Sequence, residues 1–333
     1  IYLKFLASVL ANGMILRGKR IHLVGAKGTG MAALAEILFH RGAELTGSDV
    51  SEIFQTQEIL DSIGLDTTID FSAEDLPSDI DWVIHSAAYD KRINPQLVAA
   101  NEHGIKISSY PEALGDLSKT ATSVAISGVH GKTTTAAICG LLVKALDLPG
   151  TVLTATGIPN LGGKSTTICG DSYFIAETCE YRRHFNNFDS SHLVVTSVEL
   201  EHVDVFPSYE SVLKAFCDFG IALRAGGSLI FCADDKGAAE VAANVSSSRP
   251  DVKLCSYGES AIGPLQISNI DLMSGETEFQ LNCLSDSVLL KVPGRHNVYN
   301  AAAAVGVIDI LLKEEGRVFD VAVQKEIVHA LEQ

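Results

Sequence analysis

The sequence predicts an α/β protein built from two domains, each with a mainly parallel sheet. Short apolar runs alternate with helical patterns over residues 21–110, which is typical of βαβ units. A second series of the same kind begins near Ser118. Each series opens with a glycine-rich loop between a predicted strand and a predicted helix. The length of 333 residues fits two domains of ~150 residues or more.

The first domain, residues 1–117, is expected to be Rossmann-like. Its predicted strands are residues 21–24, 44–46, 81–85 and 106–107, and its predicted helices are residues 31–40, 52–63 and 95–103. The apolar stretch 1–16 is interrupted by Lys4 and Asn12, and we expect a packed helix there, with a signal peptide as the alternative. No apolar run reaches the ~18 residues that a membrane-spanning helix needs, so no membrane insertion is expected.

The second domain, residues 118–333, is expected to be a nucleotide-binding α/β domain with a small additional β region. Its predicted strands are residues 123–127, 173–176, 193–197, 228–232 and 253–257, and its predicted helices are residues 134–146, 209–223 and 297–312. The β region is a hairpin over residues 265–284 that turns at Ser274 and Gly275.

Composition and charge exclude several classes of function. The net charge of −16 makes a nucleic-acid partner a poor expectation, because such partners are held by basic surfaces. The seven cysteines include no Cys-x-x-Cys pair, which indicates reduced thiols in a cytoplasmic protein. Neither observation argues against a nucleotide ligand, which backbone N–H groups can bind locally.

The loop that follows the strand 123–127 carries the residue types of a triphosphate site. Gly128 and Gly131 let backbone N–H groups approach phosphate oxygens, and Thr134 lies in the first turn of the following helix. Lys132 can reach the β- and γ-phosphates, and the Thr133 hydroxyl can bind Mg²⁺. The loop is a variant of the general pattern, which expects glycine at the position of Ile126.

The first domain has a glycine loop of its own. Gly28, Thr29, Gly30 and Met31 lie between a predicted strand and a predicted helix, where a diphosphate can bind to the helix N-terminus. Asp49 follows about twenty residues later, a position from which an acid binds a ribose hydroxyl in dinucleotide folds. By itself this loop suggests a nicotinamide dinucleotide or a simple tight turn.

The order of several motifs resembles the Mur ligases, and among them the members that add alanine. Gly128-Val-His130-Gly131-Lys132-Thr133-Thr-Thr resembles the family's ATP loop, including its histidine. The resemblance implies ATP-dependent ligation of L-alanine to UDP-N-acetylmuramate through an acyl phosphate, with ATP and Mg²⁺ as cofactors. The family normally has a third, C-terminal domain that binds the amino acid, and we expect this domain to be absent from residues 1–333.

The same resemblance assigns roles to further residues. Glu177, in Glu-Thr-Cys-Glu-Tyr, matches a metal-bridging carboxylate, and His202, in Ser197-Val-Glu-Leu-Glu201-His202, matches the histidine of a second metal. The expected metal ligands are therefore Thr133, Glu177 and His202. Ser197 and Glu201 stand where the family usually has Asn and Asp.

Other matching segments predict the ligand contacts. The block that begins at Gly294 predicts ATP contacts by His296, Asn297 and Asn300, and His130 is expected near the sugar substrate or the phosphoryl group. The loop residues of the first domain, Asp49 and Ser86 are expected to bind the UDP-sugar, with Lys27 at a position that is usually glycine. We expect the Lys27 side chain either to add charge to the diphosphate or to point outward.

Three other hypotheses remain open from the sequence. A recycling ligase that adds a whole peptide to UDP-N-acetylmuramate would share these motifs. The chain could instead be a non-catalytic module that binds a UDP-sugar or ATP. A simple NAD dehydrogenase would leave the second phosphate loop, Glu177 and His202 unexplained. The sequence allows a monomer or a homodimer.

Overall fold

The computed structural model describes residues 16–158 and 163–333, which form two compact units. The first unit contains the chain up to Ala121 together with Ala155–Ile168. The second unit contains Thr122–Thr154 and Cys169–Gln333. The helix expected over residues 1–16 lies outside the described residues, except for its last position.

The first unit is built around a five-stranded parallel sheet with the order β3-β2-β1-β4-β5. Its elements in chain order are β1 (Arg20–Val24), α2 (Thr29–His40), β2 (Glu44–Asp49), α3 (Gln57–Ser62), β3 (Thr67–Ile69), η1 (Ala73–Asp75), β4 (Trp82–His85), α4 (Pro95–Glu102), β5 (Lys106–Ser109) and α5 (Tyr110–Ser118). The chain changes direction across the sheet at β1, whose neighbours are β2 and β4. Ligands of open α/β sheets bind at such a switch point, beyond the carboxyl ends of the strands. The predicted parallel sheet is confirmed.

Local sequence explains where two helices of this unit begin. Asn94 accepts hydrogen bonds from the backbone N–H groups of Gln96 and Leu97 at 3.1 and 3.2 Å, which caps α4. The sequence analysis missed α5, although Ser109 and Glu112 form a capping box at its start.

The helix predicted over residues 52–63 is wrong in its first half, because α3 begins only at Gln57. Lys27 contacts the segment before this helix. Its Nζ donates to the carbonyl oxygens of Val50 and Glu52 at 2.7 and 2.9 Å, and the Thr56 hydroxyl donates to the Lys27 carbonyl at 2.5 Å. These contacts connect residues 50–56 to the glycine loop of the first unit.

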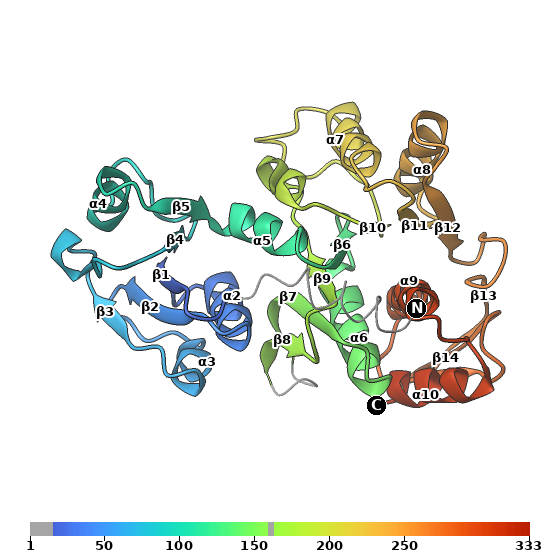
Figure 1. The fold of residues 1–333 in the computed structure, drawn as a ribbon. Helices are drawn as coiled ribbons and strands as arrows, with labels where there is room; N and C mark the ends of the chain where they lie inside the picture. The colour runs from blue at the N-terminus through green and yellow to red at the C-terminus, as the bar shows by residue number, and fades with distance from the viewer. Residues whose placement is uncertain (1–15, 159–162) are drawn as a thin grey trace. The chain divides into compact units, whose positions relative to one another are not determined.

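The second unit contains most of a seven-stranded sheet with the order β12-β11-β10-β6-β9-β7-β8. From β6 onward the elements in chain order are β6 (Thr122–Ser127), α6 (Lys132–Ala145), β7 (Gly150–Ile158), β8 (Lys164–Ile168), β9 (Tyr173–Glu177), η3 (Tyr181–Asn187), β10 (His192–Val195), α7 (Tyr209–Ile221), β11 (Ser228–Cys232), α8 (Lys236–Ser248), β12 (Lys253–Tyr257), β13 (Ile267–Leu272), β14 (Thr277–Leu281), β15 (Val288–Leu290), α9 (Arg295–Glu314) and α10 (Val321–Leu331). In Figure 1, α7 and α8 lie on one side of this sheet, and α6, α9 and α10 lie on the other. Strand β6 is the middle strand of this sheet, so the loop that follows it lies at the centre of the edge formed by the carboxyl ends of the parallel strands.

Several elements of this unit were not predicted, namely β7, β8, α8 and α10. The outer part of β7 and all of β8 group with the first unit. Glu36 on α2 explains this grouping, because its side chain is almost fully buried and accepts hydrogen bonds from Lys164 Nζ at 2.7 Å and from the Thr166 hydroxyl. The ion pair joins residues far apart in the sequence, which no local pattern shows.

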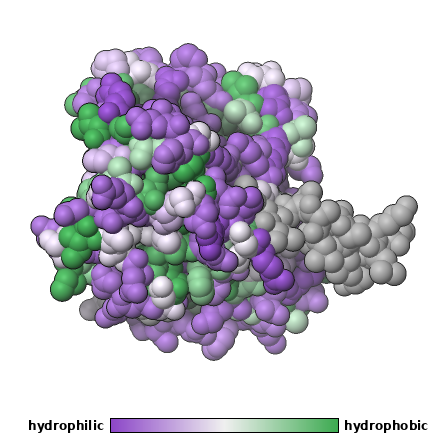
Figure 2. Space-filling view, turned by 60° about the vertical axis from the view of Figure 1, so that its left-hand side comes forward, coloured by the Kyte–Doolittle hydropathy of each residue, from purple (hydrophilic) through white to green (hydrophobic). Residues whose placement is uncertain are grey.

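The small β region is confirmed as an antiparallel sheet of β13, β14 and β15. Gly275 lies in the turn between β13 and β14 with φ +90°, a conformation that favours glycine. The face in Figure 2 is mainly hydrophilic, with small separate areas of hydrophobic side chains. Within the described part of the chain, no helix combines the length and the apolar character needed to cross a membrane.

Candidate nucleotide and metal site

The loop between β6 and α6 has a conformation that requires its glycines. Gly128 has φ +134° and Gly131 has φ +83°. A Cβ atom at Gly128 would collide with the Thr196 hydroxyl, and one at Gly131 would collide with the Asn300 side-chain oxygen. The predicted strand, loop and helix are therefore in place, with the helix N-terminus directed at the loop.

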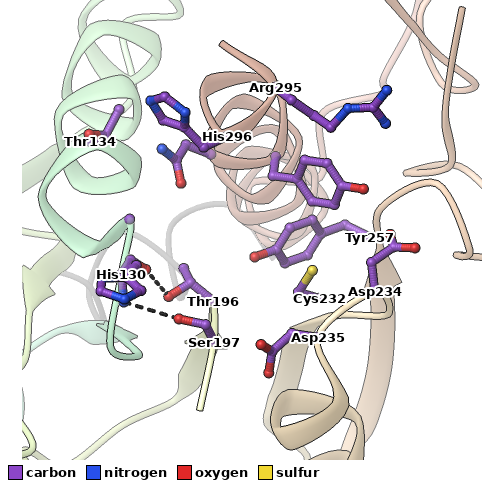
Figure 3. Close-up of a pocket in the computed structure, with 13 residues that line it drawn as sticks. His130, Thr134, Thr196, Ser197, Cys232, Asp234, Asp235, Tyr257, Arg295 and His296 are labelled. Carbon is purple, nitrogen blue, oxygen red and sulfur yellow. Dashed lines mark hydrogen bonds between the residues drawn. The ribbon is translucent and has the colours of Figure 1, made fainter. Parts of the chain in front are cut away.

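The next strand of the sheet holds this loop from its other side. The Thr196 hydroxyl donates to the carbonyl oxygens of Ser127 and His130 at 3.2 and 2.5 Å. The backbone N–H of His130 donates to the Ser197 hydroxyl at 3.0 Å (Figure 3). Val129 donates its N–H to the Ser197 carbonyl, also at 3.0 Å. Ser197, which departs from the usual Asn, thus fixes the loop backbone directly.

A cluster of charged side chains lies beside the loop. Lys132 Nζ donates to the carbonyl oxygens of Gly128 and Val129 and lies 3.2 and 3.4 Å from the two carboxylate oxygens of Glu180. Glu180 also lies 3.3 Å from His202 Nε2, and a Glu201 oxygen lies 3.8 Å from the same nitrogen. Among the described residues, one group of acidic, histidine or cysteine side chains has its ligand atoms within 4.8 Å of one another, and it consists of Glu180, Glu201 and His202.

The structure brings some of the predicted metal ligands together with residues that the sequence analysis did not choose. His202 lies in this cluster, as expected. Glu177 ends β9 next to Ile126 of β6, and Thr133 lies in the first turn of α6. The metal roles of Glu177 and Thr133 stay predictions. Glu180 was missed, although it follows Glu177 by three positions in the same motif.

A cavity of about 650 Å³ opens next to the loop (Figure 3). It is bounded by the loop, the ends of β10, β11 and β12, and the start of α9. Its lining residues are His130, Gly131, Thr134, Thr196, Ser197, Cys232, Asp234, Asp235, Tyr257, Arg295, His296, Tyr299 and Asn300. This volume is within the range of small-molecule sites, ~300–1,000 Å³. Of the predicted ATP contacts, the cavity includes Gly131, Thr134, His296 and Asn300.

The far wall of the cavity has perturbed ionisable groups. The Arg295 guanidinium and the Tyr299 hydroxyl, at 2.8 Å, hold the pKa of Glu259 below its usual value. Burial, and then the hydrogen bond to Glu259, raise the pKa of Tyr299 well above its usual value. Burial also raises the pKa of Cys232 to about 11. These groups are therefore fixed as one carboxylate, one neutral phenol and one neutral thiol near neutral pH.

The predicted adenine contacts have different environments in the structure. Asn300 is 6% exposed, and its side-chain oxygen accepts from the Thr135 hydroxyl at 3.3 Å, so it connects α9 to α6. Asn297 donates from Nδ2 to the Pro293 carbonyl at 2.9 Å, at the start of α9. His296 folds back against Gly294 and faces the cavity. The nucleotide roles of these residues stay predictions.

The glycine loop of the first unit is held in a similar way. Asp49 is 4% exposed and accepts from the backbone N–H groups of Lys27 and Val50, each at 2.7 Å, and from the Tyr89 hydroxyl at 3.4 Å. Lys27 is itself 6% exposed, with Nζ on the carbonyl groups described above. The alternative in which Lys27 points outward is therefore wrong, because its ammonium is directed inward at the backbone of residues 50 and 52, and its contribution of charge to a diphosphate stays a prediction.

Comparison with known protein families decides the classification. The model of the Mur ligase middle domain matches residues 126–308, more than half of the chain. The chain belongs to the Mur ligase family. A second model, for the Mur ligase family catalytic domain, matches residues 20–122. The resemblance inferred from the motifs is thus confirmed.

Individual Mur ligases resemble the chain over most of its length. The UDP-N-acetylmuramate–L-alanine ligase of Treponema pallidum is 42% identical over 298 residues, which are 90% of this chain and 62% of that protein. The enzyme of the same name from Borreliella burgdorferi is 37% identical over 304 residues, 90% of this chain and 64% of that protein. The chain therefore spans less than two thirds of the length of these relatives.

Solved structures show the same Mur ligase fold. The crystal structure of UDP-N-acetylmuramate–alanine ligase from Thermotoga maritima has a TM-score of 0.74 at 24% identity and covers 94% of this chain and 68% of that one. A ligase from Neisseria that joins UDP-N-acetylmuramate to L-alanyl-γ-D-glutamyl-meso-diaminopimelate has a TM-score of 0.74 at 20% identity, with 94% and 97% coverage. At these identities the likeness supports the fold alone.

Proposed function

We propose that this chain forms the UDP-sugar-binding and ATP-binding parts of a cytoplasmic ligase that joins L-alanine to UDP-N-acetylmuramate at the expense of ATP. The names of the Treponema and Borreliella relatives support this assignment. The observation that carries it is the phosphate loop, where Lys132 and the N-terminus of α6 lie beside a buried carboxylate and a histidine.

The ATP part of the proposal rests on the loop and the neighbouring cavity. The phosphates would bind at the N-terminus of α6, near Gly128, Gly131 and Thr134, with Lys132 on the β- and γ-phosphates. The cavity between this loop and α9 would take the nucleoside, with His296 on its wall. The aromatic rings of Tyr257 and Tyr299 offer apolar surface for a purine base.

The side chains of the cluster fit a divalent cation. Glu201 offers a carboxylate oxygen and His202 a nitrogen, and Glu180 lies in the same group, whose ligand atoms are within 4.8 Å of one another. Thr133 and Glu177 are the further ligands that we propose from the sequence. When bound, Mg²⁺ would neutralise charge on the phosphoryl group that is transferred.

The chemistry needs no nucleophile from the protein. The lactyl carboxylate of UDP-N-acetylmuramate attacks the γ-phosphorus of ATP, which forms an acyl phosphate and releases ADP. The amine of L-alanine then attacks the acyl carbon, the C–O bond to phosphate breaks, and an amide and inorganic phosphate result. Lys132 would stabilise negative charge on the transferred phosphoryl group, and His130 would lie near this group or the sugar.

The first unit would hold the UDP part of the substrate. Gly28, Thr29, Gly30 and Met31 form the start of α2, where a diphosphate is stabilised by the helix N-terminus. Asp49 is the last residue of β2, and Ser86 directly follows β4. Because both Asp49 oxygens already accept hydrogen bonds, contact with a ribose would require one of these bonds to be shared or exchanged.

Phosphate release by the full-length gene product tests this function. Release from ATP should require both UDP-N-acetylmuramate and L-alanine, and the product should gain the mass of one alanyl residue. Release with a peptide such as L-alanyl-γ-D-glutamyl-meso-diaminopimelate, but not with L-alanine, would replace the proposal by the recycling ligase. Release with neither amine, despite ATP binding, would favour a non-catalytic module.

A further inference from the structure

Glu180 is a buried acid placed between two basic side chains. It is 2% exposed, so its carboxylate has lost nearly all contact with water and needs compensating partners. One oxygen lies 3.4 Å from Lys132 Nζ and 3.3 Å from His202 Nε2, and the other lies 3.2 Å from Lys132 Nζ. The Glu180 carboxylate therefore contacts both Lys132 of the phosphate loop and His202.

The backbone that follows Glu180 has strained φ angles and is held by a hydrogen bond and by a buried phenylalanine. Arg182 and Arg183 have φ +49° and +56°, which costs ~1–3 kcal/mol for each such residue. The Arg183 N–H donates to the Glu180 carbonyl at 2.8 Å. Phe185 is 1% exposed and stacks on Phe219 with ring centroids 4.6 Å apart. The core thus holds a turn that would otherwise relax, and the turn presents Glu180 to the loop.

His202 is held by the same turn. It has φ +54°, another conformation that is unusual for a residue with a side chain. The Tyr181 ring packs edge-on against the His202 ring with centroids 5.1 Å apart, and the Tyr181 hydroxyl donates to Asp204 at 3.1 Å. Glu180 and Tyr181 together therefore fix the imidazole in orientation.

Lys132 has two kinds of partner. The carbonyl oxygens of Gly128 and Val129 are neutral acceptors from the loop itself, whereas Glu180 is a buried charge. A phosphate oxygen can replace the neutral acceptors while the carboxylate keeps its place on the other side of the ammonium. Such charge-assisted hydrogen bonds are the stronger ones, so the lysine would stay aimed at the phosphate site.

We propose that Glu180 is a positioning residue, which sets the Lys132 ammonium and the His202 imidazole in one arrangement for the Mg²⁺-bound triphosphate. The proposal rests on the proposed function, because it concerns the same ATP site. It predicts that Glu180 and His202 are coupled in binding Mg·ATP, and that Glu180 contributes less once His202 is gone, because only its contact with Lys132 then remains.

A double-mutant cycle on residues 1–333 tests this coupling. Binding of Mg·ATP is measured by calorimetry for the wild type, Glu180→Gln, His202→Ala and the double variant. Glu180→Gln keeps the shape and removes the charge, and it should weaken Mg·ATP binding by about tenfold or more. In the His202→Ala background the same change should weaken binding less than it does in the wild type, because only the contact with Lys132 is then lost. Glu326→Gln, an exposed acid on α10, is the matched control and should bind like the wild type.

The possible outcomes separate this proposal from the proposed function. No binding of ATP to the wild type contradicts the proposed function itself. Wild-type binding with a Glu180→Gln effect that is absent, or equal in both backgrounds, overturns only the positioning role. If melting curves show that Glu180→Gln does not fold, Glu180→Asp takes its place in the cycle under the same criterion, since it keeps the charge and retracts it by one methylene.

Discussion

Gly131 provides a direct test of how the phosphate loop is built. Its φ of +83° is a conformation that costs a residue with a side chain ~1–2 kcal/mol. A Cβ atom there would also collide with the Asn300 oxygen, which accepts the Thr135 hydroxyl. Loss of that hydrogen bond adds ~0.5–1.5 kcal/mol. Gly131→Ala should therefore lower the free energy of unfolding by about 1.5–3.5 kcal/mol.

Gly226→Ala is the matched control. Gly226 has a similar φ of +73°, and a Cβ atom there would have no other atom within 4 Å. It should cost only the backbone strain, about 1–2 kcal/mol. For units of this size the melting temperature falls by ~2–4 °C per kcal/mol, so Gly131→Ala should melt about 3–14 °C lower and the control about 2–8 °C lower.

Calorimetric melting and ATP titration of Gly131→Ala and Gly226→Ala test whether Asn300 shapes the loop. Gly131→Ala should also weaken ATP binding by about tenfold or more, because the displaced Asn300 moves the backbone N–H groups that face the phosphates. The control should keep wild-type affinity. Equal melting and equal ATP affinity of the two variants would refute the argument that Asn300 shapes the loop.

Three further predictions concern other parts of the chain. Lys27→Gly removes the ammonium that holds the carbonyl groups of residues 50 and 52, so amide hydrogen exchange over residues 50–56 should become faster; unchanged protection would contradict this role for Lys27. Burial lowers the pKa of His22 below its ordinary value of 6.5, so the stability that His22 contributes is complete above pH 6.5 and is lost as the pH falls below it. The melting temperatures of the wild type and His22→Gln should therefore converge as the pH falls from about 7.5 to about 5.5. A melting-temperature difference that stays constant over this range would speak against burial as the cause. Phe185→Ala should cost about 3–5 kcal/mol in chemical denaturation, and the exposed Phe39→Ala much less; equal costs would mean that Phe185 does not anchor the turn at Glu180.

The sequence predicted the parts of the fold that depend on local pattern. The parallel strands and the βαβ rhythm could be seen because buried strands are short apolar runs. The hairpin of β13 and β14 was visible from its turn at Gly275, whereas the third strand, β15, was not predicted. Strand β8 and the grouping of its hairpin with the first unit depend on the contact of Glu36 with Lys164 and Thr166, which joins residues over a hundred positions apart.

Some residues of the candidate site were chosen from the sequence, and others were missed. Lys132 was chosen because phosphate chemistry restricts residue type and spacing in the loop, and His202 was chosen from the family resemblance. Glu180 was missed because its importance comes from burial and from its two partners, which only the folded turn reveals. Tyr257 lines the cavity from the end of β12, which no motif marked, whereas Arg295 and Tyr299 stand within the block that begins at Gly294 and were not chosen from it.

Binding of ATP and of UDP-N-acetylmuramate to Lys132→Ala tests the central claim, that the two units carry separate ligand sites. Equilibrium titrations of wild type and variant with each ligand, in the presence of Mg²⁺, are sufficient. The account predicts that the variant loses ATP binding by about a hundredfold or more and retains UDP-N-acetylmuramate affinity within about twofold. Parallel loss of both ligands, or loss of the UDP-sugar alone, would contradict it.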